Sequence, residues 1–219
     1  DTETTGVQVE RDRIVTAALV RRTDQGEETN ATWLINPGVE IPSPATAVHG
    51  ITTERARAEG RDPAEALEEI AARLAAALAD GLAVLAFNAA YDLRILGAEL
   101  KRHGLASLEE RLGTAVAPVI DPLVIDRGVD RYRRGKRKLG DLMAVYGVRD
   151  SARLHDALED VRQAIAVFDA IERHHAQVAA MDATALHAWQ HKAHRQWAHG
   201  FNEWLSSRGR PADADPAWP

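Results

Sequence analysis

The sequence predicts an α/β fold in which helices pack on a mixed β-sheet. Two strand-like segments come first in the chain, and helix-like and strand-like segments alternate after them. This order is typical of layered α/β domains. The chain has 219 residues, of which 45% are hydrophobic and 27% charged, which suits a globular protein with one sizeable core.

The first two strands are expected over residues 13–22 and 31–36. Both segments are rich in β-branched and apolar side chains, and Asp24, Gln25 and Gly26 between them favour a hairpin connection. Residues 37–44 contain three prolines and a glycine, so a loop is expected there.

A helix is predicted over residues 63–80. Pro63 stands near its start, acids fill its first turns, and Gly81 follows its end. The remaining segments are shorter or less sharply bounded. Helices are expected over 89–102, 139–146 and 156–179, and short strands over 83–87 and 116–121.

The last part of the chain carries an aromatic stripe. Within residues 184–206, large apolar side chains recur at four-residue steps, which predicts an amphipathic helix. The stripe consists of Trp189, Ala193, Trp197, Phe201 and Leu205, with Trp204 adjacent. We expect this helix to pack on the core; contact with a second copy or with a partner protein is the alternative.

These patterns divide the chain into three parts. Residues 1–180 form the expected main domain, 181–208 the tail helix, and 209–219, with three prolines, a flexible tail.

Composition excludes several classes of site. The chain has no cysteine, so disulfides, thiolate metal sites and a cysteine nucleophile are excluded. Carboxylates and histidines remain as metal ligands, which favours Mg²⁺ or Mn²⁺. No apolar run approaches the ~20 residues of a membrane span, and no secretory signal is visible, so we expect a cytoplasmic protein without membrane contact. The net charge of −6 disfavours nucleic acid as a partner unless positive charge is concentrated locally.

Acidic residues gather at three places. Asp1 and Glu3 would share one face of a strand, where two anions repel unless a cation lies between them. Asp92 lies early in the helix that follows the strand 83–87, at the strand end where α/β folds place their sites. The alternatives are a polar chain end for the first pair and a favourable helix-dipole contact for Asp92. Asn88 is expected to cap the same helix.

His155 and Asp160 are five residues apart, so on one helix they would point about 140° away from each other. If both serve one site, His155 lies in a loop before the helix, Asp156 caps the helix, and Asp160 follows one turn later. The alternative for His155 is a surface histidine. Taken together, four acids suit a pair of divalent ions for phosphodiester hydrolysis, and a neutral histidine suits proton transfer from water.

Four segments occur in a characteristic order, namely DTETTG, AVHGIT, FNAAYDLRIL and HDALEDV. From Asp1 to about Ile171 the chain thereby resembles the histidine branch of the DEDD superfamily of 3′→5′ exonucleases, which includes the proofreading subunit of bacterial replicative polymerases. The resemblance implies a ribonuclease H-like fold, two divalent ions (Mg²⁺ or Mn²⁺) and stepwise release of nucleoside 5′-monophosphates from a free 3′ end, with single-stranded DNA preferred. RNA trimming, or nucleic-acid binding without catalysis, is the alternative.

The resemblance also implies roles for individual residues. Asp1, Glu3 and Asp160 would hold the catalytic metal, Asp92 would support the second ion, and His155 would be the general base. The family has a hydrophobic strand before its first aspartate, so we expect the protein to continue upstream of Asp1. Residues implied to contact the terminal nucleotide, or belonging to the same motifs, are Thr4, Thr5, Gly6, His49, Gly50 and Asn88.

A basic run, RYRRGKRK, covers residues 131–138. An exonuclease with an acidic net charge needs a local positive surface, so we expect phosphate contacts here, chiefly from Arg133, Arg134 and Lys136. A solvated loop is the alternative.

Overall fold

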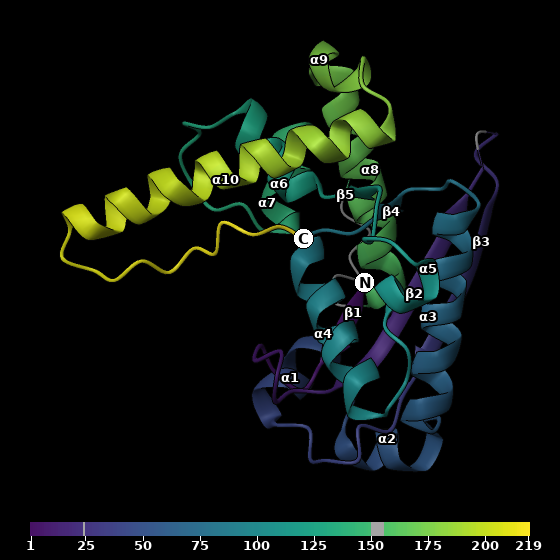
Figure 1. Ribbon diagram of the computed structural model, residues 1–219. Helices are drawn as coiled ribbons and strands as arrows, with labels where there is room; N and C mark the ends of the chain where they lie inside the picture. The colour runs from purple at the N-terminus through teal and green to yellow at the C-terminus, as the bar shows by residue number, and fades with distance from the viewer. Residues whose placement is uncertain (24, 150–155) are drawn as a thin grey trace.

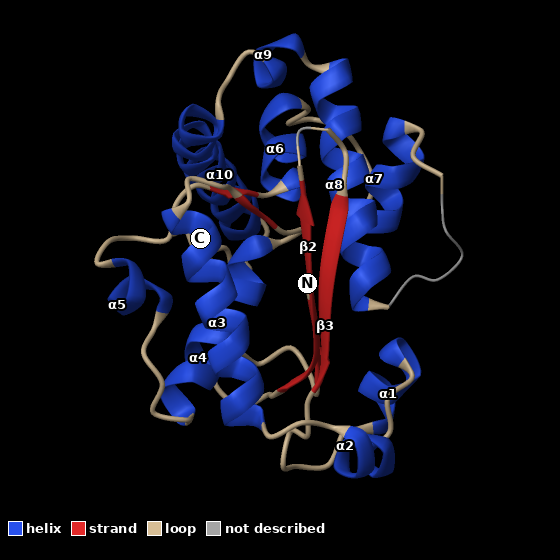
Figure 2. Cartoon of the chain, turned by 90° about the vertical axis from the view of Figure 1, so that its right-hand side faces the viewer, coloured by secondary structure: helices blue, strands red, loops and turns tan. Residues whose placement is uncertain are grey.

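The strands form two small sheets. The computed structural model describes residues 1–23, 25–149 and 156–219. Within them, β1 (Thr2–Thr4), β2 (Ile14–Arg22) and β3 (Glu28–Leu34) form an antiparallel sheet in the order β1-β2-β3, and β4 (Val84–Leu85) pairs in parallel with β5 (Val119–Ile120). The predicted hairpin is confirmed, with β2 and β3 paired from Thr16 opposite Leu34 to Arg22 opposite Glu28 (Figure 2).

The helices surround these strands. In chain order they are α1 (Ser43–His49), α2 (Thr53–Glu59), α3 (Pro63–Ala79), α4 (Ala89–Arg102), α5 (Leu108–Leu112), α6 (Pro122–Val129), α7 (Leu139–Tyr146), α8 (Ala157–His174), α9 (Ala176–Ala179) and α10 (Ala183–Ser207). The predicted helices at α3, α4, α7 and α10 are confirmed to within a residue at each end. The helix expected over 156–179 is interrupted at His175, whose extended backbone separates α8 from α9.

Four helices of eight residues or fewer were not predicted: α1, α2, α5 and α6. Helices of this length are marginal in isolation and depend on tertiary packing, which periodicity in the sequence does not show. Most of the loop expected over 37–44 is present, but α1 begins inside it with Pro44 in its first turn.

Helices cover both faces of the β2–β3 hairpin. On one face, Ile14 and Trp33 pack against Leu67 of α3 and Ile95 of α4. On the other face, Ala18 packs against Ala157 and Val161 in the first turns of α8. This second contact places the beginning of α8 against the central strand of the sheet, next to β1 (Figure 1).

Asp121 caps two helices at once. Asn88, the expected cap of α4, has a left-handed backbone (φ 63°) and makes no capping bond through its side chain. Instead the buried Asp121 carboxylate accepts hydrogen bonds from the backbone N–H groups of Asn88 and Ala89 at 3.0 Å and from that of Leu123 at 2.9 Å. One carboxylate therefore satisfies the first N–H groups of α4 and α6 and ties the two helices together.

The helix α10 packs on α6 and β5, and the segment 209–219 runs back along it (Figure 1). Asn202 bonds the backbones of Asp213 and Ala214, and Trp218 is only 3% exposed. The segment expected as a flexible tail is thus placed against the domain by a buried indole, and its flexibility stays a prediction. In the part of the chain that the structure describes, no helix combines the length and the apolar character that crossing a bilayer requires.

Candidate metal centre

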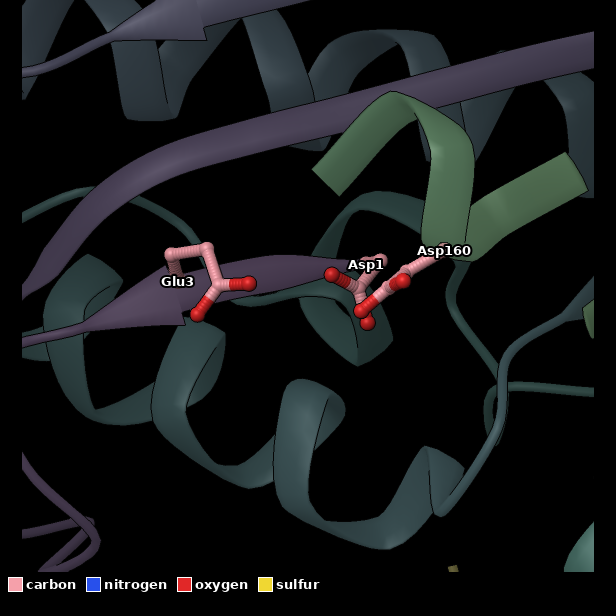
Figure 3. A group of neighbouring side chains, drawn as sticks. All are labelled: Asp1, Glu3 and Asp160. Carbon is pink, nitrogen blue, oxygen red and sulfur yellow. The ribbon is translucent and has the colours of Figure 1, made fainter. Parts of the chain in front are cut away.

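Three of the predicted acids converge. Asp1 directly precedes β1, Glu3 lies within it, and Asp160 lies in the first turn of α8. Their carboxylate oxygens lie within 4.8 Å of one another (Figure 3). Asp156 accepts a hydrogen bond from the N–H of Leu158 at 3.0 Å, which confirms it as the cap of α8. This cap fixes where α8 begins and so places Asp160 one turn in, opposite β1.

Asp92, at the start of α4, lies beside this group rather than within it. The hydroxyl of Thr2, between Asp1 and Glu3 in the chain, donates to Oδ1 of Asp92 at 2.7 Å. The bond joins β1 to α4 and fixes the orientation of the Asp92 carboxylate.

The electrostatics of the group suit a cation. Burial, together with the nearby carboxylates of Asp160 and Asp92, raises the pKa of Glu3 to about 7. Burial also raises the pKa of Asp92, against the hydrogen bonds from Thr2. Carboxylates whose ionisation is opposed by burial, and for Glu3 also by neighbouring negative charge, are stabilised in their charged form by a divalent ion between them. The donor set consists of oxygen atoms, so Mg²⁺ or Mn²⁺ fits it.

The segment Thr4–Gly6 is held rigidly next to these acids. The hydroxyl of Tyr91 in α4 donates to the carbonyl of Gly6 at 2.7 Å. The same hydroxyl lies 2.9 Å from the side-chain hydroxyl of Thr4. Thr5 is buried, with its hydroxyl bonded to Asp12. A Cβ at Gly6 would lie 2.6 Å from the Asp12 carboxylate, so a side chain here would displace Asp12 from its bonds to Thr5 and Gln8.

The structure brings His49 to Thr4. The N–H of Ile51 donates to Nδ1 of His49 at 3.1 Å, which leaves the ring proton on Nε2. Burial lowers the pKa of His49, while the facing backbone of Thr4 opposes that shift. Gly50, with φ 74°, ends α1 and turns the chain there. His49 therefore presents a buried, neutral N–H beside the backbone of Thr4.

Asn88, the remaining residue of the acidic motifs, is exposed at the start of α4. His155 falls outside the described residues.

The basic run divides into two groups. Arg133 and Arg137 bond the buried carboxylate of Asp126, the former at 2.8 Å, and both side chains are mostly covered. Arg134 and Lys136 are exposed. Arg133 therefore neutralises a buried acid, and the expected phosphate contact stays a prediction for all three residues.

Three contributors were missed in the sequence. Thr2 and the Tyr91 hydroxyl act through bonds to Asp92 and Gly6, and Asp121 acts by fixing the start of α4. Only Thr2 carried a local signal, since it stands between two candidate ligands.

Comparison with known proteins shows the family of the chain. Residues 1–168 match the RNase_T family, described as exonuclease. Over 101 residues the chain is 40% identical to a DNA polymerase III subunit epsilon-like protein of Rhodobacter capsulatus, an alignment that covers 44% of this chain and 13% of the relative.

Solved exonucleases share the fold. E. coli exonuclease I in complex with a dT13 oligonucleotide matches with a TM-score of 0.68 at 18% identity, over 81% of this chain and 41% of that one. A moderately thermophilic exonuclease I from Methylocaldum szegediense matches with a TM-score of 0.67 at 22% identity, over 93% and 44%. The expected ribonuclease H-like fold is thereby confirmed, and the chain spans less than half the length of either exonuclease.

Proposed function

The chain belongs to the RNase_T exonuclease family, and on this premise we propose that it is a divalent-metal-dependent 3′→5′ exonuclease that releases nucleoside 5′-monophosphates. The observation that carries the proposal is the convergence of Asp1, Glu3 and Asp160, with Asp92 alongside. We further propose DNA as the preferred substrate, in keeping with the polymerase-subunit-like relative and the oligonucleotide complex of exonuclease I.

Asp1, Glu3 and Asp160 would hold one Mg²⁺ or Mn²⁺, and Asp92 would support a second. Two such ions, when bound, supply an activated water and stabilise charge on the attacking and leaving oxygens. Two further residues would position the groups of the site. Thr2 orients the carboxylate of Asp92, and Tyr91 holds the backbone of Thr4–Gly6.

The same segment would receive the terminal nucleotide, with the Nε2–H of His49 as a donor beside it. His155 is proposed as the base that takes the proton from the attacking water, because a neutral imidazole titrates near physiological pH.

The test is digestion of a 5′-labelled single-stranded oligonucleotide with Mg²⁺ or Mn²⁺. We expect products that shorten by one nucleotide at a time, and no product in EDTA. Asp160→Asn should cleave at least ~10²-fold more slowly, because losing a metal ligand costs more than the 10–100-fold lost when a residue that hydrogen-bonds a ligand is removed. Internal cleavage products, or activity that survives chelation, would refute the proposal. A matched RNA oligonucleotide degraded faster than the DNA would refute the DNA preference alone.

A further inference from the structure

Three aromatic rings form a ladder on α10. The rings of Trp197 and Phe201 stack with centroids 5.5 Å apart and 12° between their planes, and Phe201 and Trp204 stack at 5.7 Å and 22°. Spacings of four and three residues place all three on one side of the helix. Trp204 is 45% exposed, so the outer end of the ladder is open to solvent.

Arginines line this ladder. The guanidinium of Arg127 in α6 lies 3.7 Å from the ring centroid of Trp197, and that of Arg208 lies 5.1 Å from Trp204. Arg131 reaches α10 at Gly200, where its Nη2 atom would lie 3.1 Å from an added Cβ. Gly200 adjoins Trp197 and Trp204 on the helix surface, so Arg131 lies against the ladder.

The loop that carries Arg131 extends the positive surface. Residues 131–138 contain six lysines and arginines, of which Arg133 and Arg137 pair with the buried Asp126. Arg134, Lys136 and Lys138 are exposed, and Tyr132 is 84% exposed. The exposed rings of Tyr132 and Trp204, beside exposed lysines and arginines, suit a single strand, whose bases stack and whose phosphates need positive charge.

We propose that this aromatic–basic surface, formed by the ladder of α10 and the loop 131–138, binds single-stranded nucleic acid. The proposal rests on the proposed function only in its choice of nucleic acid as ligand. Gln190 accepts a hydrogen bond from the N–H of Asp121, the residue that caps α4, and Trp204 lies 14 residues further along α10, or ~21 Å at 1.5 Å per residue. In Figure 1 the C-terminal end of α10 projects away from α4 and β1, so this surface would contact the strand away from the end that the metal centre would bind.

The test measures affinity without catalysis. Binding of a fluorescein-labelled dT20 to the wild-type chain and to Trp204→Ala is followed by anisotropy in EDTA, with the oligonucleotide checked for integrity. We expect a Kd raised about 5-fold or more by Trp204→Ala, the scale of one lost base–aromatic stack. Trp204→Phe, which keeps a stacking face, should recover most of the affinity.

The charged part of the surface is tested by salt. Arg131→Ala should weaken binding and lower the slope of log K against log[salt] by about 1, the value for one lost phosphate contact. Arg57→Ala, an exposed arginine on α2, is the matched control and should change neither quantity.

Unchanged dT20 affinity in Trp204→Ala would overturn the proposal. So would loss of self-association in that variant at unaltered dT20 affinity, measured by sedimentation, which would assign the ladder to a contact between two copies. Because hydrolysis plays no part in these measurements, their failure leaves the proposed exonuclease activity untouched, and the reverse also holds.

Discussion

At the scale of single residues, the candidate centre depends on side chains with unequal tasks. Asp1, Glu3 and Asp160 would supply oxygen ligands, whereas Thr2 would act only by bonding Asp92. A ligand and a positioning residue should respond differently to substitution, and two predictions use that difference.

His155→Ala should lower the rate of 3′-end cleavage by ~10²-fold, the usual contribution of a general base. Because the role proposed for His155 is proton transfer, Mn²⁺ affinity measured by calorimetry should stay at the wild-type value. Wild-type activity in this variant would remove His155 from the mechanism.

Thr2→Val removes the hydroxyl that bonds Asp92 and keeps the shape of the side chain. Partners that orient a metal ligand typically contribute 10–100-fold, so we expect Mn²⁺ affinity and cleavage rate to fall about 10-fold. Thr29→Val, an exposed position on β3, is the matched control. If Thr2→Val binds Mn²⁺ as the control does, the bond to Asp92 has no positioning role.

At the scale of elements, Asp121 joins α4, α6 and α10. Its carboxylate caps the first two helices, while its N–H and the carbonyl of Val119 bond the buried amide of Gln190. These bonds set where α4 begins, and with it the position of Asp92. Burial raises the pKa of Asp121 to about 6, against the hydrogen bonds that it accepts.

This pKa predicts a pH dependence of stability. With a folded pKa of about 6 and an unfolded value near 3.8, the folded state binds more protons between these limits, so ionisation of Asp121 lowers the free energy of unfolding as pH rises from 4 to 6. At 1.36 kcal/mol per unit this amounts to about 3 kcal/mol.

Asp121→Asn lacks the ionisation. Relative to the wild type, its free energy of unfolding should therefore improve by up to that amount between pH 4 and pH 7, as measured by urea denaturation. A relative stability that is flat or declines over this interval would show that Asp121 ionises without cost.

At the scale of the whole molecule, the last segment of the sequence packs against α4, β5 and α6. The segment 209–219 returns along α10 and ends with Trp218 packed against Ala89, Val119 and Val124, its Nε1–H 3.4 Å from Asp121. Arg94 of α4 pairs with Asp215 at 2.7 Å. The end of the sequence thus covers the junction where α4, β5 and α6 meet.

Trp218→Ala should lower the free energy of unfolding by about 2–3 kcal/mol. This is less than the 3–5 kcal/mol for a tryptophan in a continuous core, because a terminal segment can detach locally. Trp204→Ala serves as the control and should cost under about 1 kcal/mol, since that ring is half exposed. Equal urea midpoints for the two variants would show that the segment contributes nothing to stability.

The sequence alone determined the parts of the fold that local patterns encode. Periodicity and end signals identified the β2–β3 hairpin and α3, α4, α7 and α10, and the ordered motifs contain the three acids that converge in the structure. These signals lie within a few residues of one another, or in motifs that keep their order along the chain.

Only the tertiary structure decided which partner each polar group takes. Asn88 had the local signal of a cap, yet Asp121, 33 residues away, caps α4. Arg133 belonged to a charge run, yet the buried Asp126 binds it. Trp218 lies in a proline-rich segment, yet its indole N–H lies beside Asp121, which is 97 residues away in the sequence. Burial selects among distant polar partners because an unpaired buried charge is costly, and that selection depends on packing, which no local pattern encodes.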